Sequence, residues 1–403
     1  SRKITKGDIF IAIKTENNDG HNYVSSAFQS GAMAAIVAKD RADSFNPAEK
    51  KRCIIVDDPL SAVQKAAVEY RKKLNIPFIA ITGSSGKTTT RHFVSSVLES
   101  KFTIGKTVGT WNNHIGVPLS ILRMTGKEKI AVVEFGANHR NEIAPLSRIA
   151  KPDIGVITNI GYAHIGYFGS LKNTTNAKFE ITAGMSKKKG LLLLNGDDTR
   201  LVSKSKENGI QVRFFGFSKK CHIQPKDYAL SSNHDTLFYI DKHKYILSSF
   251  GKHFVYSALP AIFIARKFGI PSDVISDVLY TVKPDSLRGG IETIGGMTFI
   301  IDCYNANPSS MDHAINLLTD FAANRNKCAV IGDMLELGRY NKNLHMQLGK
   351  KLAKAGINKV IVVGEFTEYV LQGALQGGMK KKNIFTCPIA IDAVNIVKRE
   401  FKK

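Results

Sequence analysis

The chain has 403 residues, more than one compact hydrophobic core usually serves, so two or three domains are expected. Its composition is 43% hydrophobic and 23% charged, as in globular proteins, and no apolar run is long enough to cross a bilayer, which excludes a membrane-spanning class. The net charge of +23 comes from lysines that are scattered or in short runs without interleaved aromatic residues, so anionic metabolites are favoured over nucleic acid as partners.

Short apolar runs alternate with amphipathic stretches along the whole chain, which predicts an α/β fold. Most of the later runs are continuously apolar, as in parallel strands that helices cover on both faces. The expected strands are residues 9–13, 35–37, 53–56, 78–82, 130–135, 154–159, 190–195, 298–303, 328–331 and 360–363. The expected helices include residues 60–74, 89–99, 256–268 and 309–323.

The stretch 211–250 differs because it is polar, strand-prone and rich in His, Asn and Asp turns, so it predicts a small antiparallel region. Residues 75–77 and 283–286 are typical of linkers. The chain opens almost directly on an expected strand without a signal-peptide pattern, and we expect an upstream segment to precede it.

The cysteines are dispersed, and none forms a CxxC pair or a set with zinc spacing. An odd number of separated thiols without a secretion signal predicts reduced cysteines and a cytoplasmic protein. The five are Cys53, Cys221, Cys303, Cys328 and Cys387.

Residues 82–89, TGSSGKTT, stand between an expected strand and an expected helix. Glycines allow backbone N–H groups to approach phosphates, Lys87 supplies a positive charge, and the Thr88 hydroxyl suits Mg²⁺. The full phosphate-loop pattern requires a glycine where this chain has Ile81, so the loop is a shortened variant. The context predicts ATP binding in preference to a chance Gly-Lys-Thr.

Four further polar residues follow expected strands or lie near them. Glu134 ends an apolar strand, the place where α/β sheets position metal and ligand contacts. Taken alone, His164 would be a hydrogen-bonded loop residue, Lys178 a solvated lysine and Asp302 a capping acid.

The ordered motifs resemble those of the Mur ligase family, and most closely its branch that adds D-alanyl-D-alanine. The matching blocks span nearly the whole chain: GDIFIAIK…DGHNYV (7–24), TGSSGKTTT (82–90), WNNHIGVPLSILR (111–123), EFGANHRNEI (134–143), KPDIGVITNIGYAHIGYFGSL (151–171), NAKFEI (176–181), DCYNANPSSM (302–311) and GDMLELG (332–338).

The resemblance implies three domains. Residues 1–76 would bind the UDP part of a substrate, residues 77–283 would form the ATPase with a phosphate loop on a parallel sheet, and residues 284–403 would form a Rossmann-like domain. It implies a cell-wall ligase in which ATP activates a UDP-muramoyl-peptide carboxylate as an acyl phosphate, and an amine such as D-Ala-D-Ala displaces phosphate. The implied cofactors are ATP and Mg²⁺, and we expect a monomer acting on small molecules.

The resemblance also assigns roles to residues. Lys87, Lys178, His164 and Arg288 would be catalytic, with Lys178 the lysine that the family carbamylates. Metal ligands would be Thr88, Glu134, His164 and carbamylated Lys178. ATP contacts would be Gly83, Ser84, Ser85, Gly86, Lys87, Thr88, Thr89, His253, Ser257, Arg288, Asp302, Tyr304 and Asn305. Substrate contacts would be Ser1, Arg2, Asn112, Asn113, Asn138 and His139.

The chain departs from the family at several positions. The HNxxN stretch near adenine is replaced by residues 253–257, HFVYS, where Phe254 could stack on a base and Ser257 could accept one bond. Thr110 stands where Asn is common, and the chain stops at Lys403, before a KGSR-type segment. These departures leave three alternatives open: a ligase of another wall polymer such as archaeal pseudomurein, a basic nucleic-acid-binding ATPase, and a scaffold that binds ATP without turnover.

Overall fold

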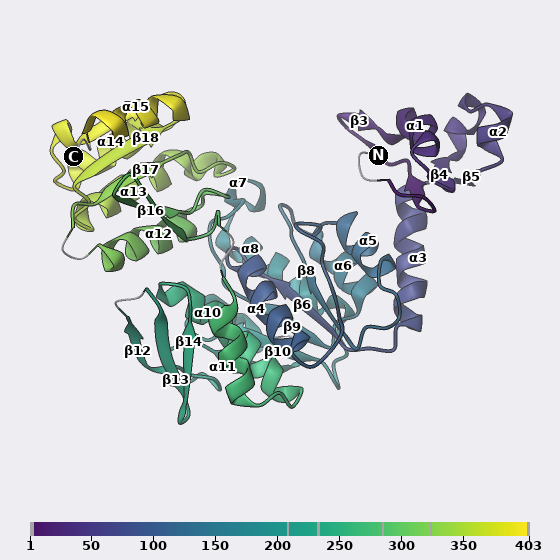
Figure 1. The fold of residues 1–403 in the computed structure, drawn as a ribbon, viewed down its shortest axis with the longest axis horizontal. Helices are drawn as coiled ribbons and strands as arrows, with labels where there is room; N and C mark the ends of the chain where they lie inside the picture. The colour runs from purple at the N-terminus through teal and green to yellow at the C-terminus, as the bar shows by residue number, and fades with distance from the viewer. Residues whose placement is uncertain (1–3, 208, 232–233, 284–285, 323–324, 401–403) are drawn as a thin grey trace. The chain divides into compact units, whose positions relative to one another are not determined.

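The computed structural model describes residues 4–207, 209–231, 234–283, 286–322 and 325–400, and confirms the α/β class. The chain forms two compact units (Figure 1). The first contains the described part of 1–75 together with 107–126, and the second contains 76–106 and the described part of 127–403. The expected domains 1–76, 77–283 and 284–403 remain a prediction. The expected domains place 107–126 in the second domain, whereas these residues belong to the first compact unit. The second expected boundary, at 284, lies outside the described residues.

The first unit is built on a three-stranded parallel sheet in the order β1-β4-β5. Its core is formed mainly by small apolar residues such as Val24, Ala27 and Val37. The strands are β1 (Ile9–Ile11), β4 (Ala34–Ala38) and β5 (Cys53–Val56), with a short hairpin of β2 (Lys14–Thr15) and β3 (Asn18–Asp19). The helices are η1 (Gly20–Tyr23), α1 (Val24–Gln29), η2 (Lys39–Ser44), α2 (Pro47–Lys50), α3 (Pro59–Lys73) and α5 (Gly116–Leu122).

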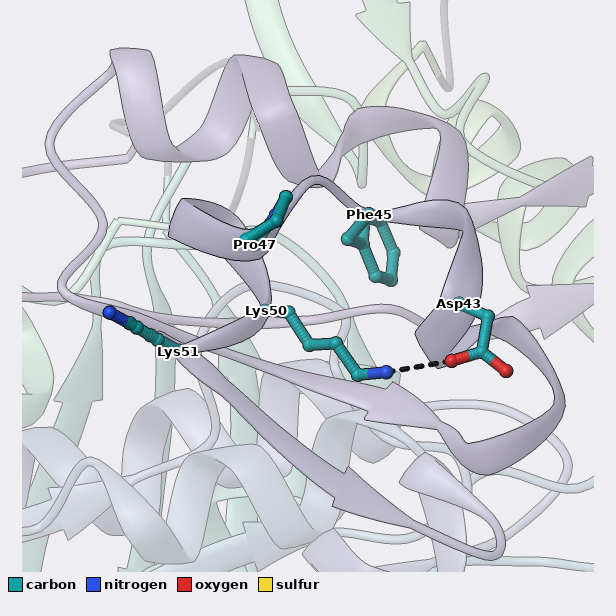
Figure 2. A pocket seen from close by; sticks show the side chains of 5 residues that line it. All are labelled: Asp43, Phe45, Pro47, Lys50 and Lys51. Carbon is teal, nitrogen blue, oxygen red and sulfur yellow. Dashed lines mark hydrogen bonds and ion pairs between the residues drawn. The ribbon is translucent and has the colours of Figure 1, made fainter.

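A shallow hollow lies beside α2 in this unit, and Figure 2 shows the side chains that line it. The Lys50 ammonium donates to the Asp43 carboxylate at 2.6 Å, so these two charges offset each other. Phe45, Pro47 and Lys51 complete the lining. None of the five is a predicted site residue, and the hollow is therefore not a candidate for the ATP site.

The second unit is organised around a six-stranded parallel sheet in the order β11-β10-β9-β6-β8-β7. β6, β8, β9 and β10 are fully buried, as their continuous apolar runs predict. The strands are β6 (Phe78–Thr82), β7 (Ile104–Lys106), β8 (Ile130–Glu134), β9 (Ile154–Ile157), β10 (Leu191–Asn195) and β11 (Gln211–Phe215). The accompanying helices are α4 (Lys87–Glu99), α6 (Ile143–Ala150), α7 (Ile165–Phe168), α8 (Leu171–Phe179), η3 (Glu180–Gly184), α9 (Thr199–Ser205), α10 (Lys252–Lys267) and α11 (Ser272–Thr281).

The expected antiparallel region at 211–250 is partly right. β12 (Lys226–Leu230), β13 (Thr236–Ile240) and β14 (His243–Leu247) do form an antiparallel sheet, which lies beside α10 and α11 (Figure 1). The prediction was wrong for β11, which pairs in parallel with β10. Because α9 carries the chain back across the sheet, β11 returns in the same direction as β10, and its polar pattern reflects an edge position.

The C-terminal part of the second unit has a three-stranded parallel sheet of β17 (Cys328–Ile331), β18 (Lys359–Val363) and β19 (Ile384–Cys387). The expected strand at 298–303 pairs instead with a strand that the sequence did not reveal. β15 (Gly290–Ile294) and β16 (Met297–Ile301) form a hairpin around a Gly295-Gly296 turn. The helices are α12 (Pro308–Phe321), η4 (Gly338–Tyr340), α13 (Asn341–Lys354), α14 (Thr367–Gln376), η5 (Lys381–Asn383) and α15 (Ala390–Glu400).

Within the described ranges, no helix combines the length and the apolar character that a bilayer crossing demands.

Candidate functional site

The predicted phosphate loop connects β6 to α4 at the carboxyl end of the parallel sheet. β6 lies between β8 and β9, where the strand order reverses direction, which is the usual ligand position in open α/β sheets. Ile81, at the position of the missing glycine, is a fully buried residue of β6, so the loop turns only from Gly83 onward. A Cβ on Gly83 would lie 1.9 Å from Thr158 Oγ1, so only glycine fits this close approach.

Side chains that follow β9 hold the loop in place. Asn159 Oδ1 accepts a hydrogen bond from the Ser85 backbone N–H at 3.0 Å, and Thr158 Oγ1 donates to the Ser85 carbonyl at 2.6 Å. Ser84 Oγ accepts from the Gly161 N–H at 2.8 Å. The loop conformation is therefore fixed by the protein before any phosphate arrives, which lowers the ordering cost of binding.

Lys87 begins α4, two residues earlier than predicted, and its ammonium donates to the Gly83 carbonyl at 3.0 Å. Gly86, the N-cap residue, supplies no side-chain cap, so the first N–H groups of this helix face the loop. Burial lowers the pKa of Lys87, the nearby Arg288 cation lowers it further, and the Glu134 carboxylate opposes both. A half-buried ammonium next to a helix N-terminus is a strong site for phosphate oxygens.

Glu134 ends β8 and is only 1% exposed. Its Oε1 lies 3.3 Å from the Thr88 hydroxyl, which donates to it, and its Oε2 pairs with Arg91 Nε at 3.3 Å. One hydroxyl and one carboxylate fit Mg²⁺, which usually takes one or two protein oxygens and completes its shell with water and phosphates. Among the described residues no group of three His, Cys, Asp or Glu side chains forms a metal cage, so phosphate and water oxygens would have to supply the remaining ligands.

His164 precedes α7 with a left-handed φ of +56°, and its Nδ1 contacts the carboxylate of Glu336. Burial lowers the pKa of His164, and the charges of Lys87 and Lys178 lower it further, against the raising effect of Glu336. The ring therefore belongs to the same cationic region as the phosphate loop. The partner of its Nδ1, however, is a carboxylate of the C-terminal part of the chain.

Lys178 lies on α8 and is 2% exposed, not solvated. Its ammonium is 3.5 Å from the Ala137 carbonyl, just after β8, and 5.3 Å from the centre of the Phe168 ring. Burial, reinforced by Lys87 and opposed by Glu142 and Glu180, lowers the pKa of Lys178 to about 7. Near neutral pH, Lys178 is thus a neutral amine in a large fraction of the molecules, and the neutral amine is the form that reacts with carbon dioxide.

Arg288 and the residues that follow β16 form another wall of the site. The Arg288 guanidinium stacks on the Tyr304 ring, 3.7 Å from its centre, and its Nε is buried without a partner. Burial raises the pKa of Asp302 to about 6, while Arg288 opposes that rise. Tyr304 and Asn305 are exposed in the same loop. The positive charge of Arg288 also lowers the pKa of Lys87, so the two cations act on each other.

The residues expected near adenine lie on α10. Ser257 Oγ is close to the phosphate loop, 3.7 Å from where a Cβ on Gly86 would stand, and it donates to the His253 carbonyl at 3.4 Å. The structure removes one expectation, because Phe254 is 1% exposed within the hydrophobic core and cannot stack on a base. His253 instead stacks on His313 of α12, with the ring centroids 5.5 Å apart.

The predicted substrate contacts fall into both units, and Ser1 and Arg2 lie outside the described residues. In the first unit, Asn113 Oδ1 accepts from the N–H groups of Ile115 and Gly116 and so starts α5. In the second unit, Asn138 and His139 are exposed, and both backbone N–H groups donate to Glu142. Asn112, of the first unit, is half-buried. Their substrate roles remain predictions.

Comparison with known proteins decides the family. Residues 81–265 match the Mur ligase middle domain, and residues 290–400 match the Mur ligase glutamate ligase domain. The UDP-N-acetylmuramoyl-tripeptide–D-alanyl-D-alanine ligase of Bacillus subtilis (strain 168) is 36% identical over 379 residues, which cover 93% of this chain and 81% of that protein. The chain belongs to the Mur ligase family. The resemblance to its D-alanyl-D-alanine branch is confirmed, since the Escherichia coli (strain K12) ligase of the same name is 31% identical over 91% of the chain and 80% of its own length.

Solved structures of the Mur ligase family share the whole fold. MurF from Acinetobacter baumannii superposes with a TM-score of 0.87 at 28% identity, over 99% of this chain and 86% of that one. The MurF ligase of Thermotoga maritima, solved in complex with ADP, gives 0.85 at 26% identity, over 100% and 90%. A pseudomurein peptide ligase from Methanothermus fervidus, at 20% identity and a TM-score of 0.62 over 95% and 79%, shares the fold alone.

Several residues of this Mur ligase site were not identified from the sequence. Arg91, Thr158, Asn159 and Glu336 each bond directly to a predicted site residue or to the loop that carries one. Thr158 and Asn159 do carry a signal, because polar residues at the end of a buried strand next to the phosphate loop are placed to contact it. Arg91 had no signal, since an arginine on a helix is ordinarily solvated.

Proposed function

We propose that this member of the Mur ligase family is an ADP-forming peptide ligase that joins the tripeptide carboxylate of a UDP-muramoyl peptide to D-Ala-D-Ala. The observation that carries the proposal is the joined set of Lys87, Thr88 and Glu134 in a chain 36% identical to a relative of that name. The Thermotoga maritima relative solved with ADP supports the nucleotide assignment.

The reaction runs in two steps. A carboxylate oxygen of the tripeptide bonds to the γ-phosphorus of ATP, and the bond to the β,γ-bridging oxygen breaks, giving an acyl phosphate and ADP. The amine of the dipeptide then bonds to the acyl carbon, loses a proton, and inorganic phosphate leaves. Positioning and charge neutralisation dominate this chemistry, since neither step requires a covalent bond to the protein.

The chain would supply that neutralisation with two cationic side chains and a helix N-terminus. Lys87 and the N–H groups of α4 would hold the phosphates, and Arg288 would offset charge as it moves to the leaving ADP. Thr88 and Glu134 would hold a Mg²⁺ ion, which when bound neutralises phosphate oxygens. Asp302, Tyr304 and Asn305 would contact ribose and adenine, with Ser257 and His253 near the base.

Lys178 would carry a negative charge after its amine is converted into a carbamate. The ammonium form first loses one proton to solvent, and the neutral amine nitrogen then bonds to the carbon of carbon dioxide and releases a second proton. A buried cation thereby becomes an anionic carbamate. Burial and the charge of Lys87 favour this change, because a lysine with a pKa of about 7 holds its proton weakly. The carbamate oxygens and His164 would then hold a second metal ion, in addition to the one assigned to Thr88 and Glu134.

The remaining assignments are part of the same proposal. Asn112, Asn113, Asn138 and His139 would contact the muramoyl peptide or the dipeptide. Dependence on ATP and five free thiols favour a cytoplasmic enzyme, and a monomer is sufficient for the proposed chemistry.

The test is a coupled assay with purified protein, UDP-N-acetylmuramoyl-tripeptide, D-Ala-D-Ala, ATP and Mg²⁺. We expect stoichiometric ADP and a product heavier by one D-Ala-D-Ala residue, with Lys87→Ala reducing turnover by at least 100-fold. Product formation with another amine or another wall-polymer precursor, and none with this pair, would overturn the acceptor assignment but keep the ligase class. ATP turnover that responds to DNA or RNA at low salt, without ligation, would support the nucleic-acid alternative instead.

A further inference from the structure

The segment 336–340, which contains the end of the GDMLELG motif, is joined tightly to α7. The Gly166 N–H donates to the Glu336 carbonyl at 2.8 Å. Two side chains reach the other end of α7, since Arg339 Nη2 and the Tyr340 hydroxyl both donate to the Gly169 carbonyl, at 3.1 and 2.9 Å. The two backbones are nearly in contact, because a Cβ on Gly166 would lie 2.7 Å from the Glu336 carbonyl oxygen.

Apolar packing also holds the segment 336–340 against α7. Ile165 of α7 is fully buried in one core with Met334 and Leu337, which flank Glu336. Buried His345 accepts a hydrogen bond from the Met334 N–H at 3.1 Å, so the segment is also anchored to α13. The position of the Glu336 backbone is therefore determined by contacts other than its own side chain.

The Glu336 side chain meets His164, the residue immediately before α7. Its carboxylate contacts His164 Nδ1. An ionised carboxylate can only accept, so Nδ1 carries the hydrogen of a neutral imidazole and the lone pair stays on Nε2. The charges of Lys87, at the phosphate loop, and of Lys178 both act on the ring.

We propose that Glu336 is a positioning residue that fixes the Nδ1–H form and the orientation of His164, so that Nε2 is free to bind a divalent cation at the phosphate site. This proposal rests on the proposed function for the presence of that cation. A carboxylate behind a metal-binding histidine commonly orients the ring and makes it a better ligand. Metal binding in the central part of the chain would then depend on a contact from its C-terminal part.

The first experiment needs neither metal nor substrate. In protein labelled with ¹⁵N-histidine, long-range ¹H–¹⁵N spectra at pH 8 distinguish the two neutral forms of each ring, and His164→Ala assigns the signal. We expect the unmodified chain to show Nδ1–H at His164 and Glu336→Ala to shift the ring toward the Nε2–H form. A His164 that is already Nε2–H in the unmodified chain overturns the proposal.

The second experiment measures Mn²⁺ binding by electron paramagnetic resonance in the presence of a non-hydrolysable ATP analogue. We expect Glu336→Ala to raise the dissociation constant about 10- to 100-fold, the range for residues that support metal ligands. Glu336→Gln keeps an oxygen that can accept a hydrogen bond from Nδ1. Its Mn²⁺ dissociation constant should lie between those of the unmodified chain and of Glu336→Ala. Leu335→Ala is the matched control, because Leu335 is 65% exposed in the same segment and should bind Mn²⁺ as the unmodified chain does.

The outcomes separate this proposal from the proposed function. Unchanged Mn²⁺ affinity in Glu336→Ala, with normal ligase activity in the unmodified chain, overturns the positioning role and leaves the function standing. The expected tautomer and affinity changes in a chain that does not ligate D-Ala-D-Ala support the positioning role and reject the function. Near-ultraviolet circular dichroism of each variant shows whether a change comes from loss of the fold.

Discussion

The Thr88 hydroxyl lies 3.3 Å from the Glu134 carboxylate and donates a hydrogen bond to it, which joins the start of α4 to the end of β8. Arg91 occupies the other carboxylate oxygen at 3.3 Å. Glu134 is thus a buried anion held between a hydroxyl and a cation, with Lys87 close enough for its pKa to respond. Thr88 and Glu134 would hold a metal ion here through oxygen atoms, which are the ligands that Mg²⁺ prefers.

Glu134→Gln tests this arrangement. The amide keeps the shape of the side chain but removes its negative charge, so Mg²⁺ should bind more weakly and the ion pair between Arg91 and Glu134 should be lost. We expect the Mg²⁺ concentration for half-maximal activity to rise at least 10-fold and the free energy of unfolding in urea to fall by about 1–3 kcal/mol. An unchanged Mg²⁺ requirement in a folded variant would remove Glu134 from the metal site.

Gly83→Ala tests the close approach between the phosphate loop and the end of β9. The added methyl would lie 1.9 Å from Thr158 Oγ1 at a backbone φ of +148°, so the loop must move. We expect the dissociation constant for ATP, measured by calorimetry, to rise at least 10-fold. Gly209→Ala is the control, since its φ of +66° is also unfavourable but nothing lies within 4 Å of the new methyl. Equal effects of the two variants on ATP binding would contradict the steric argument.

Much of the fold follows from hydrophobic pattern, and the exceptions have physical causes. Strands such as β6, β8 and β10 are continuously apolar because they are buried on both faces, and the sequence locates them. β15 and β19 were missed because they are short and partly exposed, so that little apolar pattern marks them. The direction of β11 depends on how the chain crosses the sheet, which local pattern does not encode.

Some residues of the candidate site could likewise be located from the sequence, and others could not. Lys87 and Glu134 could be located from their places next to a strand and a loop. The roles of Lys178 and Arg288 came only from family resemblance. The pair of His164 and Glu336 joins residues 172 positions apart, and no local signal identifies which distant carboxylate a histidine will meet. Phe254 illustrates the opposite error, since an aromatic residue in a binding motif can belong to the core.

Asp302→Asn should change the pH dependence of two properties, the stability of the fold and the binding of ATP. Its folded pKa of about 6 lies above the usual 3.8, so between about pH 4 and 6 the folded chain holds a proton that the unfolded chain releases. Stability from this group therefore falls as pH rises through that window and stays reduced above pH 6. We expect the Asn variant to unfold at higher urea than the unmodified chain at pH 8 and at the same urea at pH 3.5.

Ionisation of the same carboxylate should strengthen ATP binding, although it lowers the stability of the fold. The proposed hydrogen bond from a ribose hydroxyl is stronger to ionised Asp302 than to its protonated form, so the KM for ATP of the unmodified chain should rise as pH falls below about 6. The Asn variant should have a higher KM that changes less with pH over this range. A variant whose KM follows the same pH curve as the unmodified chain would show that another group is responsible.

The buried Lys178 should carry a carbamate when carbon dioxide is present. The pKa of about 7 leaves a large neutral fraction at pH 8, and the modification removes a cation that burial and Lys87 both disfavour. We expect protein equilibrated with ¹³C-bicarbonate to show one carbamate ¹³C signal, and ligase activity to fall in carbon dioxide-free buffer and recover when bicarbonate is restored. Lys178→Met should lose the signal, whereas Lys172→Met, at an exposed lysine on the same helix, should retain it. A signal that survives Lys178→Met would place the carbamate elsewhere, and full activity without carbon dioxide would show that the ligase does not need it.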